Sequence, residues 1–284
     1  MSLSNQLLDA EALAELSRLR PGARQRALRT IGEAEFARCA SDPIYWLDSS
    51  RHLYPYVYTN DPKPLHECIH CHTQHHFHRR KPHLEFAHSI ETDDLDVLRG
   101  HFIELSGTRP FTLHDYMRPI IHWWQRDQFV LVEKSRDMMA TWMVVALYTW
   151  DTLFHSNRQN IFQSLVSAKT AELVRRSLFI YKNQPKFLRD IHKATYNVGQ
   201  NRAGMLLVES LDSEILGFPQ GPEEIRQYHP TGVFQDEAAY QPMAGDAFAA
   251  IKPAIQSGGR FTAISSANPG WFMLACRDRD QESV

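Results

Sequence analysis

Short apolar runs alternate with longer helix-like stretches along the second half of the chain. Phe129–Glu133 (FVLVE) and Gly204–Glu209 (GMLLVE) have the length and continuous hydrophobicity of strands buried on both faces of a sheet. Lys169–Asn183 instead repeats its apolar residues near one face of a helix. The further predicted elements are a strand within Gln159–Ala168, strands at Val233–Asp236 and Arg260–Ser265, and helices at Met139–Phe154 and Met243–Ile255. This alternation predicts an α/β fold with a mostly parallel central sheet flanked by helices.

The first part of the chain follows another pattern. Residues 1–40 place leucines at roughly helical spacing, which predicts a helix. That helix includes RLRPGARQRALR, whose arginines form either a solvated face or an arm that contacts phosphates. Residues 42–65 predict irregular structure, and LHDYMRPIIHWW predicts a helix with Pro119 in its first turn or at a kink. We therefore expect an N-terminal helical and His/Cys-rich segment, 1–110, followed by one domain, 111–284.

Composition excludes several classes of protein. No apolar run among the 284 residues approaches the roughly 18 of a membrane span. The N-terminus has neither the basic start nor the uninterrupted apolar stretch of a secretory signal. Four cysteines are too few for a disulfide scaffold, so we expect an intracellular protein. With a net charge of −2, any contact with DNA must use a local basic patch.

Histidine is the compositional anomaly, because eight of the 15 histidines lie between His66 and His88. Within this cluster, Cys68-x-x-Cys71 is a good half-site for tetrahedral zinc, and His78 and His83 have acceptable spacing for the other half. The gap between the two pairs is shorter than in a zinc finger, so a small zinc knuckle is the metal hypothesis. The alternatives are a polar surface loop that binds metal only adventitiously, and an HRRK run that contacts DNA phosphates.

Three strand ends in the second half carry candidate chemistry. FVLVEKSRDMMATW is a strand, a polar turn and a helix start, the arrangement in which backbone amides can cradle phosphate. It departs from the GxxxxGK[ST] pattern, but Lys134 and Arg136 supply cations early in the loop. GVFQDEAAY ends a strand in Asp236 and Glu237, a pair suited to hold Mg²⁺ and to polarise an attacking water. RFTAISSANP ends a third strand in small polar residues that could sense a phosphate or its water.

The order of these three ends, cradle, DE strand and polar strand end, is that of an additional-strand P-loop ATPase. Together with DPIYWLD, TNDP and ILGFPQGPEEIRQYHPTGVFQDEAAY, they resemble the large terminase subunit of tailed bacteriophages over residues of about 40–272. The resemblance implies an ATPase domain that packages DNA, with ATP and Mg²⁺ as ligands. It also implies roles for individual residues.

By this resemblance, Lys134, Ser135 and Arg136 match a deviant Walker A motif, in which an early basic residue replaces the usual lysine. Thr141 and Asp236 match the residues that hold Mg²⁺, and Glu237 matches the catalytic glutamate. Arg226 falls where the family has an arginine that reaches a neighbouring subunit's nucleotide. The residues expected to bind the nucleotide are Lys134, Ser135, Arg136, Asp137, Met138, Met139, Ala140, Thr141, Ser266 and Asn268. The last two belong to a coupling motif, Ser265, Ser266, Ala267 and Asn268.

Two departures from the family pattern stand out. Met139 and Ala140 replace the small-plus-basic pair that precedes the threonine, and methionine at that turn crowds the phosphates. Tyr116-Met117 stands where the adenine-contacting Tyr-Gln is expected, with Gln125 and Gln128 as alternatives.

The resemblance further implies double-stranded DNA, a portal protein and a small terminase subunit as partners, and a homo-oligomeric ring when assembled. It places the protein in the host cytoplasm, transiently at the procapsid portal. The chain stops shortly after the coupling motif, so we expect no DNA cleavage by this chain and a nuclease on another domain or subunit. The alternatives are a degenerate P-loop scaffold module with weak or no ATPase activity, organised by zinc, and a helicase-like DNA-dependent ATPase.

Overall fold

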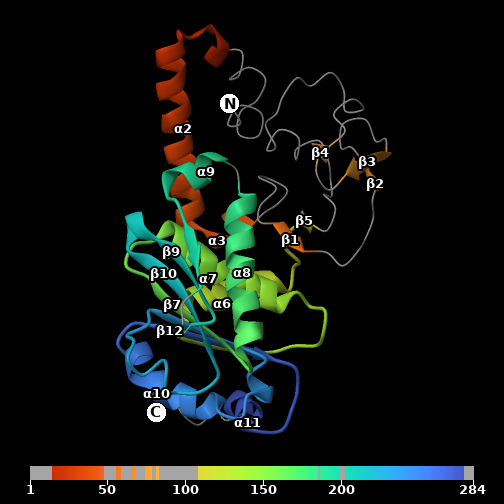
Figure 1. Ribbon diagram of the computed structural model, residues 1–284, viewed down its shortest axis with the longest axis vertical. Helices are drawn as coiled ribbons and strands as arrows, with labels where there is room; N and C mark the ends of the chain where they lie inside the picture. The colour runs from red at the N-terminus through yellow and green to blue at the C-terminus, as the bar shows by residue number, and fades with distance from the viewer. Residues whose placement is uncertain are drawn as a thin grey trace. The chain divides into compact units, whose positions relative to one another are not determined.

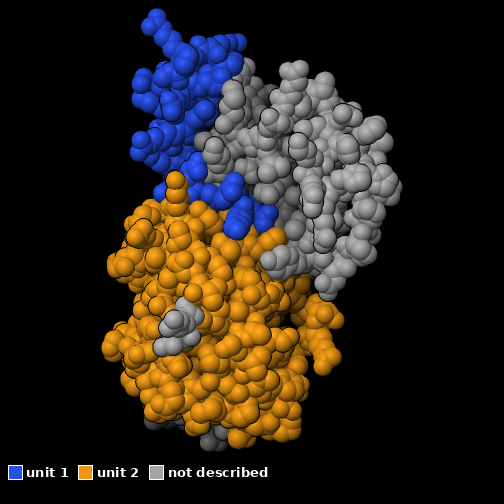
Figure 2. Space-filling view, in the orientation of Figure 1, with its two compact units in different colours: residues 1–113, 182–191 blue, residues 114–181, 192–284 orange. Residues whose placement is uncertain are grey.

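The structure, a computed structural model of the chain, describes residues 15–47, 56–58, 65–67, 74–78, 81–82, 108–184, 186–198 and 202–277. The chain divides into two compact units, which Figure 2 shows in different colours. One unit comprises residues 1–113 and 182–191, and the other comprises residues 114–181 and 192–284. We describe each unit by itself. No helix in the described part of the chain is long and apolar enough to cross a membrane.

The second unit is built on a seven-stranded sheet with the order β6-β12-β11-β7-β10-β9-β8 (Figure 1). The five strands from β6 to β10 pair in parallel, and β10, β9 and β8 pair antiparallel. The strands are β6 Phe129–Glu133, β7 Gln159–Ser164, β8 Thr195–Asn197, β9 Gly204–Val208, β10 Ser213–Pro219, β11 Gly232–Asp236 and β12 Arg260–Ser265. The predicted α/β fold with a mostly parallel sheet is confirmed.

The position of β12 shows the additional-strand arrangement. β12 lies between β6, which leads into the predicted phosphate loop, and β11, which ends in Asp236. Its register pairs Ala263 with Leu131 on one side and with Gln235 on the other. The three predicted strand ends therefore meet at one edge of the sheet, with the polar end of β12 in the middle.

Helices cover both faces of this sheet. They are α6 Met117–Arg126, α7 Ala140–Phe154, α8 Ser167–Asn183, α10 Ala244–Gln256 and α11 Trp271–Arg277, with short 3-10 turns η3 Glu209–Leu211 and η4 Ala238–Tyr240. On one face, Tyr148 of α7 packs against Phe162 and Phe234. On the other face, α10 and α11 enclose a core that includes Ile161 and Val233. Figure 1 shows α10 and α11 together below the sheet. Alternate strand residues thus point to opposite layers.

Most predicted elements of this unit appear within one or two residues of their expected bounds, but β10 and β8 were not predicted. β10 is central, between β7 and β9, yet it carries Gly217 and ends at Pro219, both of which weaken a strand signal. A Cβ at Gly217 would lie 2.9 Å from Val174, so glycine lets α8 approach the sheet closely. Pro119 sits in the first turn of α6, the first of its two predicted placements.

The described part of the first unit is mainly helical. α2 spans Pro21–Ser41, with Pro21 in its first turn, and residues 15–18 before it are helical too. The remaining elements are α3 Pro43–Leu47, α9 Lys186–Ile191, β1 Tyr56–Tyr58, β2 Leu65–Glu67, β3 Gln74–His78, β4 Lys81–Pro82 and β5 Thr108–Pro110. Buried Trp46 donates from Nε1 to Gln184 Oε1 at 3.1 Å, which ties α3 to the segment before α9. The helix predicted over residues 1–40 is therefore present from residue 15 with a bend before Pro21, and residues 1–14 lie outside the described residues.

Candidate active site

The loop from β6 to α7 starts beside the end of β12. The Lys134 backbone N–H donates to Ser265 O at 2.9 Å, which continues the β6–β12 pairing by one residue. Two non-glycine residues of the loop, Asp137 and Met139, have left-handed φ angles of 61° and 49°. Met139 is the residue before α7, a place where glycine would adopt this conformation without strain. The chain therefore makes a sharp turn before α7 with a side chain that normally disfavours it.

Thr141 and Asp236 meet at the start of α7. Thr141 Oγ1 donates to Asp236 Oδ1 at 2.9 Å, across 95 residues of sequence. Gln241 Nε2 donates to the Asp236 backbone carbonyl at 2.7 Å and holds the end of β11. Burial raises the pKa of the Asp236 carboxyl to about 6; the Thr141 hydrogen bond opposes this rise, and the Glu237 charge adds to it. The two side chains present hard oxygen atoms to one point, the kind of donor that Mg²⁺ takes.

Glu237 lies next to this pair but in a different electrostatic environment. Lys134 Nζ donates to its Oε1 at 2.7 Å, and Ser265 Oγ donates to its Oε2 at 3.1 Å. The Ser266 N–H lies 3.4 Å from the same Oε2. Burial acts to raise the pKa of Glu237, but the bonds from Lys134, Ser265 and Ser266 outweigh it and lower the pKa below its usual value. Glu237 is therefore ionised at neutral pH, as a proton acceptor must be.

The end of β12 is tied to the turn that follows β11. Asn268 Nδ2 donates to Ala239 O at 2.9 Å, and Ser266 Oγ donates to Tyr240 Oη at 3.3 Å. The predicted coupling residues thus contact η4, one turn after Glu237, as well as Glu237 itself.

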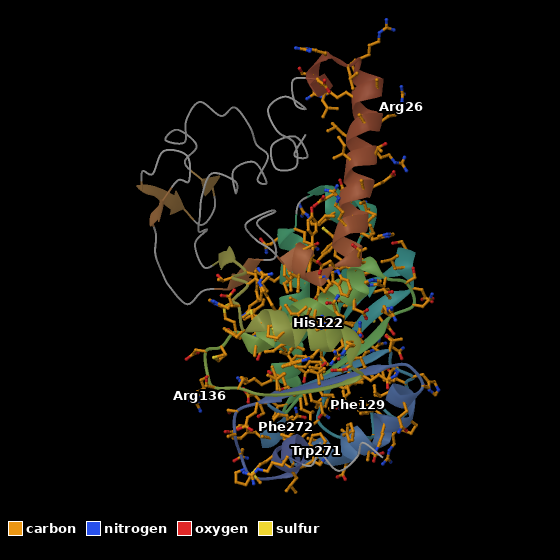
Figure 3. All side chains as sticks on the ribbon, turned by 180° about the vertical axis from the view of Figure 1, so that it is seen from behind. Arg26, His122, Phe129, Arg136, Trp271 and Phe272 are labelled. Carbon is orange, nitrogen blue, oxygen red and sulfur yellow. The ribbon has the colours of Figure 1, made fainter. Side chains whose placement is uncertain are left out.

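Several predicted site residues lie apart from this centre. Ser135, Arg136 and Asp137 are exposed, and Figure 3 shows Arg136 at the outer bend of the loop. Arg226 is exposed between β10 and β11, where its guanidinium is 3.4 Å from Glu223 Oε1. Neither arginine contacts Asp236 or Glu237 within the described part of this chain.

Of the candidates for contacting a base, only Tyr116 contacts the loop between β6 and α7 in the described part of the chain. Its hydroxyl donates to Met138 O at 2.6 Å, and its ring stacks on His114 with centroids 5.4 Å apart. Gln125 and Gln128 lie at the other end of β6, where their backbone carbonyls accept from Arg260 and Phe261. The structure thus separates these alternatives by a whole strand length.

Sequence reasoning missed three residues that support the site. Tyr240, the last residue of η4, accepts from Ser266, and Gln241, which follows it, donates to the Asp236 carbonyl. Arg176 of α8 contributes a positive charge that lowers the pKa of Asp236 against the effect of burial. The Arg176 guanidinium also lies 4.8 Å from the centre of the Trp142 ring, beside Thr141. No local sequence signal marks Arg176, because α8 approaches α7 only in the folded chain.

Only one of the four predicted zinc ligands lies among the described residues. Cys68, Cys71 and His83 lie outside the described residues, and His78 is the last residue of β3. Cys68 and Cys71 belong to the connection between the antiparallel strands β2 and β3. Among the described residues, no group of three or more His, Cys, Asp or Glu side chains is arranged to hold a metal ion.

The chain matches no protein family model, and no curated protein matches its sequence. The solved structures to which it is similar include phage large terminases. The HK97 bacteriophage large terminase is 16% identical over 55% of this chain and 34% of its own, with a TM-score of 0.44. The large terminase ATPase domain of Thermus phage P74-26 is 13% identical over 57% of this chain and 68% of its own, with a TM-score of 0.43. The large terminase of a thermophilic bacteriophage in complex with ATP-gamma-S is 15% identical over 60% of this chain and 43% of its own, with a TM-score of 0.40. The chain thus spans about a third of the HK97 large terminase.

Proposed function

We propose that the chain is the ATPase motor domain of a phage large terminase and that its ATP hydrolysis drives double-stranded DNA into a procapsid. One observation carries the ATPase part: Lys134 and Glu237 pair at 2.7 Å, and Thr141 and Asp236 pair at 2.9 Å, which joins the ends of β6 and β11 to the start of α7. The additional strand β12 between the other two strands supports the same class of ATPase. The packaging part is supported by the terminase-like motifs around Asp236 and Ser265.

The donor set fits the ligands that this proposal requires. Thr141 Oγ1 and Asp236 Oδ1 would hold Mg²⁺, which when bound supplies charge neutralisation at the phosphates. Glu237 accepts the proton of the attacking water, and Ser265 keeps its carboxylate in place. Lys134 has one side-chain partner that it can exchange: it neutralises Glu237 in this structure and turns to the phosphates when nucleotide enters the loop. Exchange of that partner frees the Glu237 carboxylate for the water.

Arg226 has the exposure that a residue acting on a neighbouring subunit needs. Its side chain is 59% exposed and its ion pair with Glu223, itself 78% exposed, is a weak surface pair. We place Arg226 at the nucleotide of the next subunit in a ring, where an arginine neutralises transition-state charge. The ring would act in the host cytoplasm at the procapsid portal, with a small terminase subunit, and with DNA cleavage assigned to another domain or subunit.

The central test is Mg²⁺-dependent ATP hydrolysis by the wild-type chain and by Glu237→Gln. Loss of a general base lowers the rate by about 10²–10⁴-fold, so we expect at least a hundredfold loss. Glu209→Gln is the matched control, because it removes an exposed glutamate in η3, away from the site, and should retain the wild-type rate. Absence of hydrolysis in the wild type, even at high protein concentration with portal and DNA, would sink the catalytic proposal.

A second candidate function is a degenerate P-loop module that holds DNA or packaging components without turnover. The strained Met139 and the neutralised Lys134 favour it, since both oppose nucleotide binding. The affinity for ATP and Mg²⁺ separates the two candidates. Tight ATP binding that is lost in Lys134→Ala supports the motor. A wild-type dissociation constant above the cellular ATP concentration supports the module.

A zinc knuckle at Cys68, Cys71, His78 and His83 is compatible with either candidate. Its support is the spacing of these four residues in the sequence. Zinc content of the purified chain tests it. We expect one zinc per wild-type chain, a loss in Cys68→Ser, and retention in Cys276→Ser, where a cysteine outside the cluster is changed. A zinc signal unaffected by Cys68→Ser removes the knuckle.

A further inference from the structure

The start of α2 carries a dense run of like charges in the described chain. Between Ser17 and Thr30 there are five arginines and no Asp or Glu, in a chain whose net charge is −2. The arginines are Arg18, Arg20, Arg24, Arg26 and Arg29, which together we call the arginine collar. Every cation of the first 62 residues is an arginine, since the first lysine is Lys63. The positive charge is therefore concentrated in one side-chain type and one place.

The collar is open to solvent and largely uncompensated. All its members are exposed except Arg24, which is half-buried. Arg29 pairs with Glu33 at 2.8 Å, with side chains 82% and 57% exposed. The other four arginines form no ion pair among the described residues. Figure 3 shows Arg26 projecting away from the axis of α2. Like charges held close together repel one another, and a bound polyanion would relieve that repulsion.

The side chains leave the helix in two directions. Residues two apart in an α-helix differ by about 200°, so Arg24 and Arg26 lie on opposite sides of α2. Arg29 follows Arg26 by three residues and lies beside it, and Arg20, the residue just before α2, stands four residues before Arg24. A helix is about 10–12 Å wide with its side chains, and the major groove of B-DNA is about 12 Å wide. A helix lying along that groove would turn one pair of arginines to each phosphate strand.

The composition of α2 argues against a membrane surface as the anion. Interfacial helices bury a face of Trp, Phe and Leu, whereas Pro21–Thr30 has only Leu28 and two alanines as apolar side chains besides its first proline. No residue from Pro21 to Thr30 is buried, so no apolar stripe separates the arginines from one another. Arginine also forms the planar, bidentate contacts that phosphate oxygens favour.

We propose that the arginine collar is a sequence-independent binding surface for the phosphate backbone of duplex DNA. The choice of duplex DNA rests on the proposed packaging function, whereas the phosphate chemistry rests on the collar itself. The contact lies outside the strand ends that form the candidate active site. It therefore holds DNA without requiring any residue of the ATPase machinery.

The test is binding of the full chain, without nucleotide, to a labelled short duplex of arbitrary sequence across about 50–200 mM NaCl. In the test variant, Arg18, Arg20, Arg24 and Arg26 are each changed to Gln, a good helix former. Each lost phosphate contact lowers the slope of log affinity against log salt by about 0.9, so we expect a slope smaller by about 3–4. Circular dichroism checks that helix content is kept.

Two control variants separate the effect of the collar from a general loss of positive charge. Changing the same four residues to Lys keeps the charge and should keep the wild-type slope. Changing the exposed Arg118, Arg126, Arg175 and Arg277 to Gln removes the same charge elsewhere and should reduce the slope less. The proposal is overturned if the wild type does not bind, if the collar variant keeps its slope, if Lys fails to replace Arg, or if both Gln variants lose equally.

These outcomes are independent of the ATPase test. A chain that shows collar-dependent binding but no hydrolysis contradicts the motor and leaves the collar standing. A chain that hydrolyses ATP with a salt slope independent of the collar contradicts the collar alone.

Discussion

Polar side chains cluster in two parts of the central sheet: the carboxyl half, where the parallel strands end, and the amino half, where they begin. The two clusters differ in burial and in charge. In the amino half, Tyr148 Oη donates to Val233 O at 2.8 Å and lies 3.0 Å from Thr262 Oγ1, with all three residues buried. At the carboxyl end, Lys134 and Glu237 pair with each other at 2.7 Å, with side chains 11% and 38% exposed. One cluster satisfies polar groups inside the core, whereas the other neutralises two charges beside solvent.

This difference separates structural from chemical use of polar residues. A buried hydroxyl bonded to backbone has no partner to exchange, so removing it costs stability. A half-exposed pair of opposite charges can exchange one partner for a ligand. We therefore expect substitutions in the amino half to change unfolding and those at the carboxyl end to change binding and turnover. The following predictions test that division.

Asp236→Asn should separate function from stability most strongly. Asn retains an oxygen that accepts from Thr141 but loses the charge that Mg²⁺ requires, so we expect Mg²⁺ affinity to fall by at least about 10–100-fold. Because burial raises the pKa of Asp236 to about 6, its charged form destabilises the fold at pH 7. The neutral variant should therefore unfold with about 1–3 kcal/mol more free energy. Calorimetric Mg²⁺ titration and chemical denaturation measure the two effects, and a variant less stable than the wild type contradicts the expected sign.

Lys134→Ala tests which basic residue of the loop serves the phosphates. A hydrogen bond to a charged group is worth about 1.5–3 kcal/mol, so we expect nucleotide affinity to fall by about 10–100-fold. Loss of the Lys134 partner should also raise the pKa of Glu237, because Lys134 is what chiefly opposes burial there. Arg136→Ala is the matched change of an exposed cation in the same loop and should weaken binding less. A larger effect of Arg136→Ala would transfer the phosphate role to Arg136.

The sequence was a good guide to this end of the sheet because its signals are local. An apolar run that ends in Asp236-Glu237 predicts both the strand and where its carboxylates emerge. The pairing of Lys134 with Glu237, 103 residues away, has no such local signal. It depends on the strand order β6-β12-β11, which brings the two strand ends to one edge.

The amino half was less predictable for the same reason. In the sequence, Tyr148 is one position of a predicted helix. Nothing near it in the sequence indicates a hydrogen bond with Thr262, 114 residues later. β10 was not predicted because glycine and proline are rare in strands. Gly217 is needed for the close packing of α8, and Pro219 is the last residue of the strand. Where a long-range contact determines which residue is present, no local pattern in a single sequence indicates that contact.

Tyr148→Phe should therefore lower the free energy of unfolding without changing the rate of ATP hydrolysis. Removal of the hydroxyl leaves Val233 O and Thr262 Oγ1 without this buried partner, at a cost of about 1–2 kcal/mol. Urea denaturation measures the loss, and ATPase assays below the transition should give the wild-type rate. Tyr228→Phe is the control, because the structure gives the Tyr228 hydroxyl no hydrogen bond among the described residues. A turnover defect in Tyr148→Phe would show that the two halves of the sheet are coupled.

The pH dependence of Mg²⁺ binding sharpens the account of Asp236. Its folded pKa is raised, so the carboxyl is neutral below pH about 6 and a proton competes with the metal there. We expect Mg²⁺ affinity to fall about tenfold for each pH unit below that value. The stability advantage of Asp236→Asn should shrink over the same range and vanish below the unfolded pKa of about 4, where both chains are neutral at this position. An Mg²⁺ affinity independent of pH between about 5 and 6 would remove Asp236 as the titrating ligand.

Met139→Gly should have the smallest effect and bears directly on the degenerate-loop alternative. A left-handed non-glycine residue costs about 1–2 kcal/mol, but glycine loses about 0.5–1 kcal/mol more backbone entropy on folding. We expect a net gain in stability below about 1 kcal/mol, together with a few-fold tighter nucleotide binding as the side chain leaves the turn. Asp137→Gly changes a residue with a similar φ angle at an exposed position, where aspartate tolerates that angle, so it should change stability little and leave binding unchanged. If both variants bind nucleotide like the wild type, Met139 does not crowd the phosphates, and the departure from glycine is only a small local strain.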